Sequence, residues 1–124
     1  MLCVLTACGP KQFPLEDAIY REDCELGNGD TVFYLTASVG DNKITFTVNT
    51  DETVLGKALL NSGIVEGEDG PYGLYIKRVN GISADYDKDK AYWAFYVDGE
   101  YATDGVDSTV IEEGKTYELR YMAD

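Results

Sequence analysis

Short runs of alternating apolar and polar residues, separated by turn dipeptides, are the feature that most restricts the fold of this chain. Residues 31–39 alternate, and after a turn at 40–43 residues 44–48 alternate again. Because a period of two places every second side chain on one side of a strand, the two runs predict a β-hairpin with one apolar face. Asn80-Gly81 and Asp98-Gly99 are dipeptides typical of two-residue hairpin turns.

One segment has a helical pattern. Its apolar face is formed by Val54, Leu55, Ala58 and Leu59. Thr50 or Asp51 could cap the start, and Gly63 could end the helix in the left-handed conformation. Further strands are expected at 74–79, 92–97, 100–102 and 116–122, and loops at 64–73 and 85–90. One short helix covers only one face of a sheet, so we expect an α+β, β-grasp-like fold: a β-hairpin, one helix, then further antiparallel hairpins on a mixed sheet.

The N-terminal residues resemble a bacterial lipobox. Leu5-Thr6-Ala7-Cys8 follows an apolar stretch and precedes polar residues. This resemblance implies a lipoprotein signal remnant over 1–8, lipidation of Cys8, and a protein held outside the cytoplasm on the bacterial membrane. The alternative is an apolar chain end with a chance cysteine. Residues 9–30 lack a period and contain several Gly and Pro, so we expect a flexible tether before a domain over 31–124.

Charge and the absence of histidine restrict the function classes. The chain has 23 acidic and 10 basic residues, for a formal net charge of −13. Such a surface repels phosphate backbones, so nucleic acid is not an expected partner, and a membrane is expected only through a lipid anchor. Solubility alone is the other explanation of this charge. Without histidine the chain lacks the commonest general base, so we do not expect an enzyme.

The stretch from Gly73 to Tyr121 resembles a bacterial domain family of unknown function that is similar to the C-terminal domain of transcobalamin and intrinsic factor. The resemblance is carried by Tyr72–Ile76, Val79–Ile82, Tyr92–Ala102, Gly105–Val106 and Glu113–Tyr117. With the preceding hairpin and helix it extends over residues 31–124. It implies a β-grasp-like fold and an extracytoplasmic location. It also implies cobalamin as a candidate ligand, because the similar vertebrate domain binds cobalamin together with a large helical domain.

Tyrosine is unusually common, with 10 copies against 4 Phe and 1 Trp. A flat ligand such as a corrin ring needs aromatic planes and apolar area. The candidate ligand-binding residues are Tyr72, Tyr75, Tyr92, Tyr96 and Tyr101, taken from a wider aromatic set that includes Tyr86 and Trp93. In the competing interpretation, Trp93 and Phe95 belong to the core, and the tyrosines cover an open sheet face.

Two acidic segments are candidates for calcium, a hard cation that prefers oxygen ligands. The candidate ligands are Asp85, Asp87 and Asp89 in one segment and Glu68 and Asp69, with Glu66 nearby, in the other. Both segments are expected at the same end of the hairpin that contains residues 74–79. The competing interpretation is a solvated charged loop, because Lys88 and Lys90 would repel a cation.

Two functions follow. The first is a ligand-binding domain of a surface lipoprotein, with cobalamin or calcium as the ligands considered. The second is an interaction or adhesion module that binds a protein or the wall at the cell surface. The sequence does not separate them.

Overall fold

The first two alternating runs form the expected β-hairpin. The computed structural model describes residues 18–71 and 73–123. Strands β2 (Thr31–Val39) and β3 (Asn42–Thr50) pair antiparallel, with Leu35 opposite Phe46. One side of this hairpin is buried in the core, as the period of two predicts; its side chains are Phe33, Leu35, Ala37, Ile44, Phe46 and Val48.

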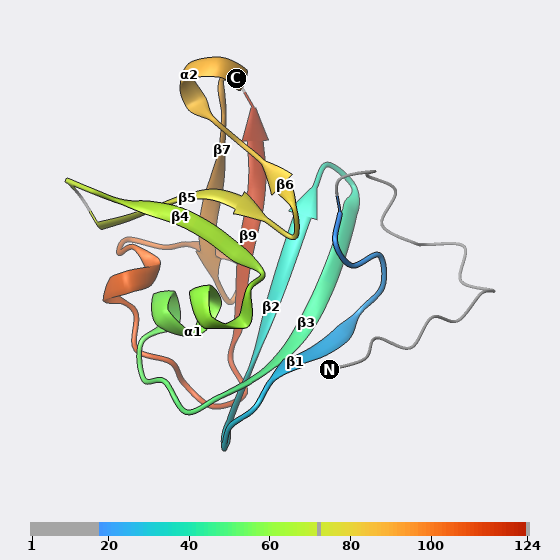
Figure 1. Ribbon diagram of the computed structural model, residues 1–124, viewed down its shortest axis with the longest axis vertical. Coiled ribbons are helices and arrows are strands. Elements are labelled where there is room, and N and C mark those ends of the chain that lie inside the picture. The colour runs from blue at the N-terminus through green and yellow to red at the C-terminus, as the bar shows by residue number, and fades with distance from the viewer. Residues whose placement is uncertain (1–17, 72, 124) are drawn as a thin grey trace.

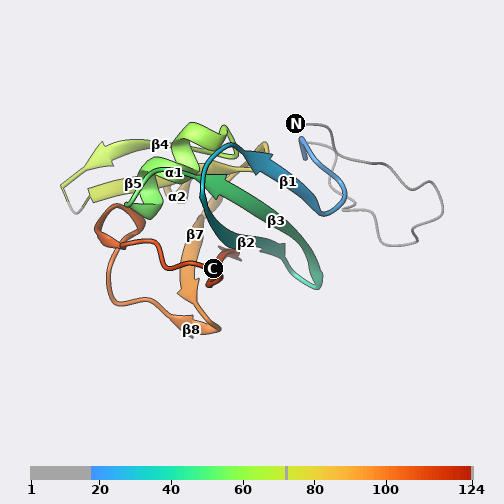
Figure 2. The same cartoon turned by 90° about the horizontal axis from the view of Figure 1, so that it is seen from below.

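The hairpin belongs to a six-stranded sheet in the order β1-β3-β2-β9-β7-β8. Figure 1 labels its first five strands, and Figure 2 labels β8. Its other strands are β1 (Cys24–Gly27), β7 (Ala91–Val97), β8 (Glu100–Tyr101) and β9 (Thr116–Ala123). The sheet is mixed, because β2 runs parallel to β9 and β1 runs parallel to β3, whereas the other pairs are antiparallel. A mixed sheet in an α+β chain is thereby confirmed.

A second layer covers one face of this sheet. It consists of α1 (Leu55–Ser62) and a three-stranded sheet formed by β4 (Val65–Gly70), β5 (Gly73–Val79) and β6 (Ile82–Ser83). Figure 2 shows α1, β4 and β5 together on one side of the large sheet. The core lies between the layers, and its largest fully buried side chains include Tyr117, Phe33 and Leu59. No helix among the described residues is long and apolar enough to cross a membrane.

The two hairpin dipeptides behave as predicted. Asn80 and Gly81 have φ values of 52° and 83°, and Asp98 and Gly99 have 50° and 88°. Positive φ at both central residues is the signature of a type I′ turn, whose twist matches that of the flanking strands. The turns connect β5 to β6 and β7 to β8.

Two segments that we expected to be loops have regular structure. Residues 64–73 contain β4, which pairs antiparallel with β5 and has a β-bulge between Glu66 and Gly67. Backbone pairing outweighs the low strand propensity of this acidic, glycine-rich segment. Residues 85–90 contain a one-turn helix, α2 (Tyr86–Asp89), because the Asp85 carboxylate accepts hydrogen bonds from the Asp87 and Lys88 backbone N–H groups.

The predicted helix start is wrong, although its end at Gly63 is confirmed by a left-handed φ of 81°. The cap is Val54, which makes no side-chain capping bond, rather than Thr50 or Asp51. Instead, Val54 forms an isolated bridge with Val110, and the Leu55 N–H donates to the Thr109 carbonyl. This pairing with a distant loop keeps the chain extended up to the first helical residue.

The expectation of a flexible tether over 9–30 is wrong for its last part. Residues 24–27 form β1, and Leu26 is buried in the core. Before this strand, the ring of Tyr20 packs edge-on against Phe46 at 5.7 Å. The packed unit therefore begins well before residue 31.

Candidate functional site

Three of the described tyrosines line one groove, which lies between β5 and β7. This aromatic groove has a volume of about 320 Å³, and a separate acidic hollow of about 360 Å³ lies beside β4. The aromatic groove, called the tyrosine groove below, is lined by Leu74, Tyr75, Ile76, Tyr92, Trp93, Ala94, Phe95 and residues 101–106. It brings together three of the predicted ligand residues, Tyr75, Tyr92 and Tyr101.

The three tyrosines reach the groove from three strands. Tyr75 lies on β5, is 38% exposed, and accepts a hydrogen bond from the Tyr86 backbone N–H at 3.4 Å through its hydroxyl oxygen. Tyr92 lies on β7, next to the buried Trp93. Tyr101 lies on the short strand β8 and is 66% exposed, which makes it the most accessible of the three. The exposed rings are accessible to a ligand, and the strands hold the backbones of these residues in place.

Tyr96, a fourth predicted ligand residue, does not line the tyrosine groove. The guanidinium carbon of Arg120 lies 3.9 Å from its ring centroid, and Tyr101 packs edge-on against it at 5.5 Å. Arg120 in turn pairs with Glu118 at 3.0 Å, and the Ser38 hydroxyl donates to Glu118 at 2.8 Å. Tyr72, the fifth predicted residue, lies outside the described residues.

This network shifts the pKa of Glu118 below its ordinary value. The hydrogen bond from Arg120 is the largest cause, the hydroxyl of Ser38 adds to it, and partial burial opposes both. The network lies on the face of the large sheet opposite α1. It stabilises the sheet surface and holds the Tyr96 ring in place.

Trp93 and Phe95 are core residues, as the competing interpretation expected. Trp93 is 6% exposed, its indole N–H donates to the Ile82 carbonyl at 3.2 Å, and its ring packs edge-on against Tyr121 at 5.5 Å. Phe95 stacks against Tyr117, with ring centroids 6.2 Å apart. Both residues also line the tyrosine groove.

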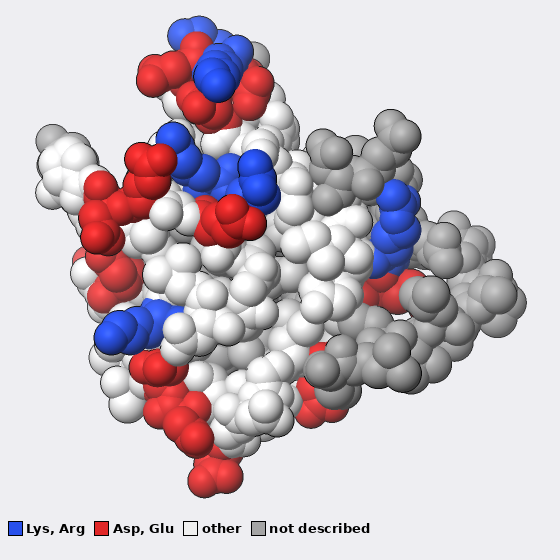
Figure 3. All heavy atoms as spheres, in the orientation of Figure 1, with Lys and Arg blue, Asp and Glu red and all other residues white. Residues whose placement is uncertain are grey.

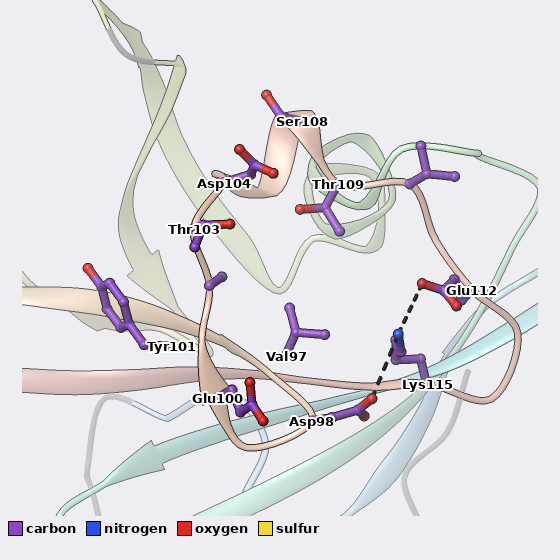
Figure 4. A pocket seen from close by; sticks show the side chains of 12 residues that line it. Val97, Asp98, Glu100, Tyr101, Thr103, Asp104, Ser108, Thr109, Glu112 and Lys115 are labelled. Carbon is purple, nitrogen blue, oxygen red and sulfur yellow. Dashed lines mark hydrogen bonds and ion pairs between the residues drawn. The ribbon is translucent and has the colours of Figure 1, made fainter.

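A larger cavity, of about 600 Å³, lies on the other side of the segment 101–104 (Figure 4). It was not predicted from the sequence, because its residues come from β7, β8 and the loop after β8. Lys115 lies in its wall, 3.0 Å from Glu112 and 3.7 Å from Asp98. The hydrogen bond to Glu112 raises the pKa of Lys115. Ser108 and Thr109 add hydroxyl groups, so this cavity is polar where the tyrosine groove is aromatic.

The short 3₁₀ helix η1 (Val106–Ser108) holds the rim of the tyrosine groove in place. The Asp107 carboxylate accepts a hydrogen bond from the Leu74 backbone N–H at 3.0 Å. Gly73 leaves room for this carboxylate, because a Cβ added there would lie 2.7 Å from its oxygens. The contact ties the start of β5 to the loop that separates the two cavities, and the sequence offered no pattern that would identify it.

The predicted calcium ligands are only partly brought together. Glu68, Asp85 and Asp89 line the hollow of about 360 Å³ beside β4, whereas Asp69 and Asp87 do not. Lys77 also lines it, and its ammonium lies 3.3 Å from Glu68, which raises the pKa of Lys77. Figure 3 shows basic and acidic side chains interspersed over this part of the surface.

The carboxylates of this hollow also have partners within the protein. Asp85 caps α2, and Asp89 accepts a hydrogen bond from the Asp85 backbone N–H at 3.2 Å. Over residues 18–71 and 73–123 there is no group of three or more Asp, Glu, Cys or His side chains placed to hold a metal ion. Cys24 lies half-buried on β1, and the predicted lipidation residue Cys8 lies outside the described residues.

Comparison with known proteins gives a family and a fold. Residues 51–123 match the family model described as "Domain of unknown function (DUF4430)". A solved structure of a protein from Ruminococcus gnavus ATCC 29149, described as a "putative metal binding protein", is 30% identical, with a TM-score of 0.70. That similarity covers 77% of this chain and 99% of the other. No curated protein matches.

A second similar structure is that of haptocorrin in complex with Cbi. It is 21% identical, has a TM-score of 0.55, and is matched over 75% of this chain. The matched part is only 25% of the haptocorrin chain, so this similarity concerns the fold of one part of that protein. The expected relation to the transcobalamin-like fold is thereby confirmed.

Proposed function

Since the chain belongs to the family described as domain of unknown function DUF4430, we propose from its geometry that it is a non-catalytic domain that binds a small ligand in the tyrosine groove. One observation carries the proposal: Tyr75, Tyr92 and Tyr101, on three different strands, line the same groove. Aromatic walls with a few polar groups are typical of small-molecule sites.

The groove favours a flat ligand with apolar area. Trp93 and Phe95 are among its lining residues, and the exposed rings of Tyr75 and Tyr101 can stack on a planar molecule. Among the described residues that line it, Asp104 is the only charged one. A corrinoid meets these requirements and is the first ligand to test, because the fold resembles a part of haptocorrin, whose structure contains Cbi.

The test is titration of the full chain with dicyanocobinamide, followed by visible absorbance and calorimetry. The full chain is needed because residues 20–27 pack on the domain. Tyr75→Ala should weaken binding by about tenfold, since the loss of one stacked ring is worth about 1.4 kcal/mol. Tyr34→Ala is the matched control, because Tyr34 is equally exposed, at 37%, but lies outside the groove. No spectral change and no heat at high micromolar ligand would remove the corrinoid, and equal effects of both substitutions would remove the groove.

Calcium binding is the second candidate function, favoured by the description of the Ruminococcus gnavus relative. The site would use Glu68, Asp85 and Asp89, with Lys77 displaced from Glu68. Calcium should then raise the melting temperature above the effect of sodium chloride at matched ionic strength, because a ligand that binds only the folded state stabilises it. Asp89→Asn should remove the calcium-specific part, whereas Asp87→Asn, at a residue outside the hollow, should leave it in place. Equal stabilisation by both salts would eliminate this candidate.

The cellular setting completes the proposal. We place the domain outside the cytoplasm on a lipid anchor at Cys8, and mass spectrometry of the membrane fraction, with any upstream coding sequence restored, should find the acylated residue. An intact Met1 on a protein absent from that fraction would contradict the anchor. The alternative role, a surface module for adhesion or protein interaction, would be favoured by a coding neighbourhood of surface proteins rather than vitamin transporters.

The parallel β2–β9 pair and the crossing helix α1 support a β-grasp-like classification of the fold.

A further inference from the structure

Two tyrosines next to the tyrosine groove already hold cations of the chain itself. The guanidinium carbon of Arg120 lies 3.9 Å from the ring centroid of Tyr96, and the Lys90 ammonium lies 5.4 Å from the ring centroid of Tyr86. A cation over the face of a tyrosine ring is attracted because that face of the π system is negative. The local surface is therefore one in which aromatic faces pair with positive charge.

The tyrosines that line the groove adjoin these two rings and hold no such cation. Tyr101 packs edge-on against Tyr96 at 5.5 Å, and the Tyr75 hydroxyl accepts a hydrogen bond from the Tyr86 N–H. Over residues 18–71 and 73–123, no Lys or Arg side chain lies over the ring of Tyr75, Tyr92 or Tyr101. Tyr75 and Tyr101 are 38% and 66% exposed, so a ligand can reach them from solvent.

The charges in and beside the groove are negative. Asp104 is the one charged residue among its described lining residues, and its carboxylate has no hydrogen-bond or ion-pair partner within that part of the chain. The segment that contains Asp104 also lines the polar cavity, where Asp98, Glu100 and Glu112 outnumber a single ammonium, Lys115. This negative potential favours a cation over a neutral molecule or an anion.

We infer that the tyrosine groove selects an organic cation whose positive charge is spread over apolar surface, such as a quaternary ammonium or a charged aromatic ring. A compact metal ion prefers several oxygen ligands, which ring faces do not supply. An alkylated or aromatic cation instead gains ring contacts over its apolar surface and places its charge near Asp104. The inference rests on the proposed function and goes further, because it specifies the charge of the ligand.

The test compares two probes that have the same shape and differ in charge, (4-hydroxyphenyl)trimethylammonium and 4-tert-butylphenol. Each is titrated into the full chain labelled with ¹⁵N, and the backbone amide shifts of Tyr75, Tyr92 and Tyr101 report binding in the groove. Replacing the central carbon by a charged nitrogen keeps the apolar contacts, so the ratio of the two Kd values measures the effect of the charge. The cation should bind at least about tenfold more tightly at low ionic strength.

Substitutions at two residues separate the sources of this preference. Tyr75→Leu keeps apolar area and removes the aromatic face, so it should lower the ratio about threefold, whereas Tyr75→Phe keeps the face and should preserve the ratio. Asp104→Asn should also lower the ratio about threefold, since it removes the nearest negative charge. Asp41→Asn is the matched control, because it removes an exposed carboxylate in the β2–β3 turn outside the groove.

The outcomes separate this inference from the proposed function. A ratio near one, a ratio unchanged by Tyr75→Leu, or no binding of either probe would overturn the preference for a cation. Equal binding of both probes at the groove amides would do so while still supporting a small-molecule site there. A tenfold ratio together with a failed corrinoid titration would support the inference and remove the corrinoid alone.

Discussion

Asn80 attaches the N-terminal segment to the second sheet, and its substitution is the sharpest test of the structure. Its side-chain oxygen accepts a hydrogen bond from the Tyr20 N–H at 2.9 Å, and its side-chain nitrogen donates to the Tyr20 carbonyl at 2.9 Å. The Asn80 carbonyl also accepts from the Ile19 N–H at 3.0 Å. The side chain thus pairs with Tyr20 as a neighbouring strand would, in a residue that is 0% exposed.

Two substitutions separate the hydrogen bonds from the backbone conformation. Asn80→Gly keeps the left-handed conformation, in which φ is 52°, and removes both side-chain bonds. At about 1 kcal/mol or slightly more for each lost bond in this partly buried contact, the free energy of unfolding should fall by about 2–3 kcal/mol. Asn80→Ala should cost about 1 kcal/mol more, because a side chain with a Cβ is strained at positive φ.

Asp98→Gly is the matched control. Asp98 occupies the same position of the other type I′ turn, with φ of 50°, but its side chain is 57% exposed. Its replacement should change stability by less than about 1 kcal/mol, since its ion pair with Lys115 is exposed and long.

The assay is urea denaturation of the full chain together with amide hydrogen exchange of Ile19 and Tyr20. Because the N-terminal segment can open without global unfolding, part of the loss should be seen as faster exchange of these two amides. Asn80→Gly within about 0.5 kcal/mol of wild type, with unchanged exchange at Tyr20, would refute the reasoning.

Three further substitutions test other contacts. Glu118→Gln should lower the melting temperature at neutral pH, and the difference from wild type should disappear at low pH. The pKa of Glu118 is lower in the folded state than in the unfolded state. Ionised Glu118 therefore stabilises the fold above the unfolded-state pKa, and this stabilisation is lost as the pH falls through the folded-state pKa. A difference in melting temperature that does not depend on pH would contradict this. Asp107→Ala should lower the free energy of unfolding in urea by about 1 kcal/mol and speed hydrogen exchange of the Leu74 amide; an unchanged Leu74 exchange rate would contradict this. Gly67→Ala should cost about 1–3 kcal/mol in the same assay, because a Cβ would overlap the Tyr75 carbonyl at the bulge, and a neutral result would disprove that close approach.

The sequence by itself determined the elements whose signals are local. The alternation of residues 31–39 and 44–48 specifies β2 and β3, since a period of two separates a buried from a solvated face. Asn80-Gly81 and Asp98-Gly99 specify their turns, because these residues tolerate positive φ. The burial of Trp93 follows in the same way from its apolar strand face.

Only the tertiary structure decided which segments become strands by pairing. The acidic run 65–70 and residues 24–27 have weak strand patterns, and each becomes a strand because a neighbour supplies backbone partners. The same holds for the side chain of Asn80, whose partner Tyr20 is 60 residues away in the sequence. No local signal encodes such a partner.

The candidate site shows the same division. The sequence places Tyr92 and Tyr96 on one face of one strand, and it treats them as equivalent. In the fold, β8 pairs with the end of β7 that contains Tyr96, and Arg120 stacks on that ring. The other end of β7 has no strand paired on that side and is covered by the second layer beside β5. The alternation of side chains along a strand can be read from the sequence. The groove forms because the second sheet lies against the edge of β7 that β8 pairs with only in part, and that arrangement depends on contacts between distant segments.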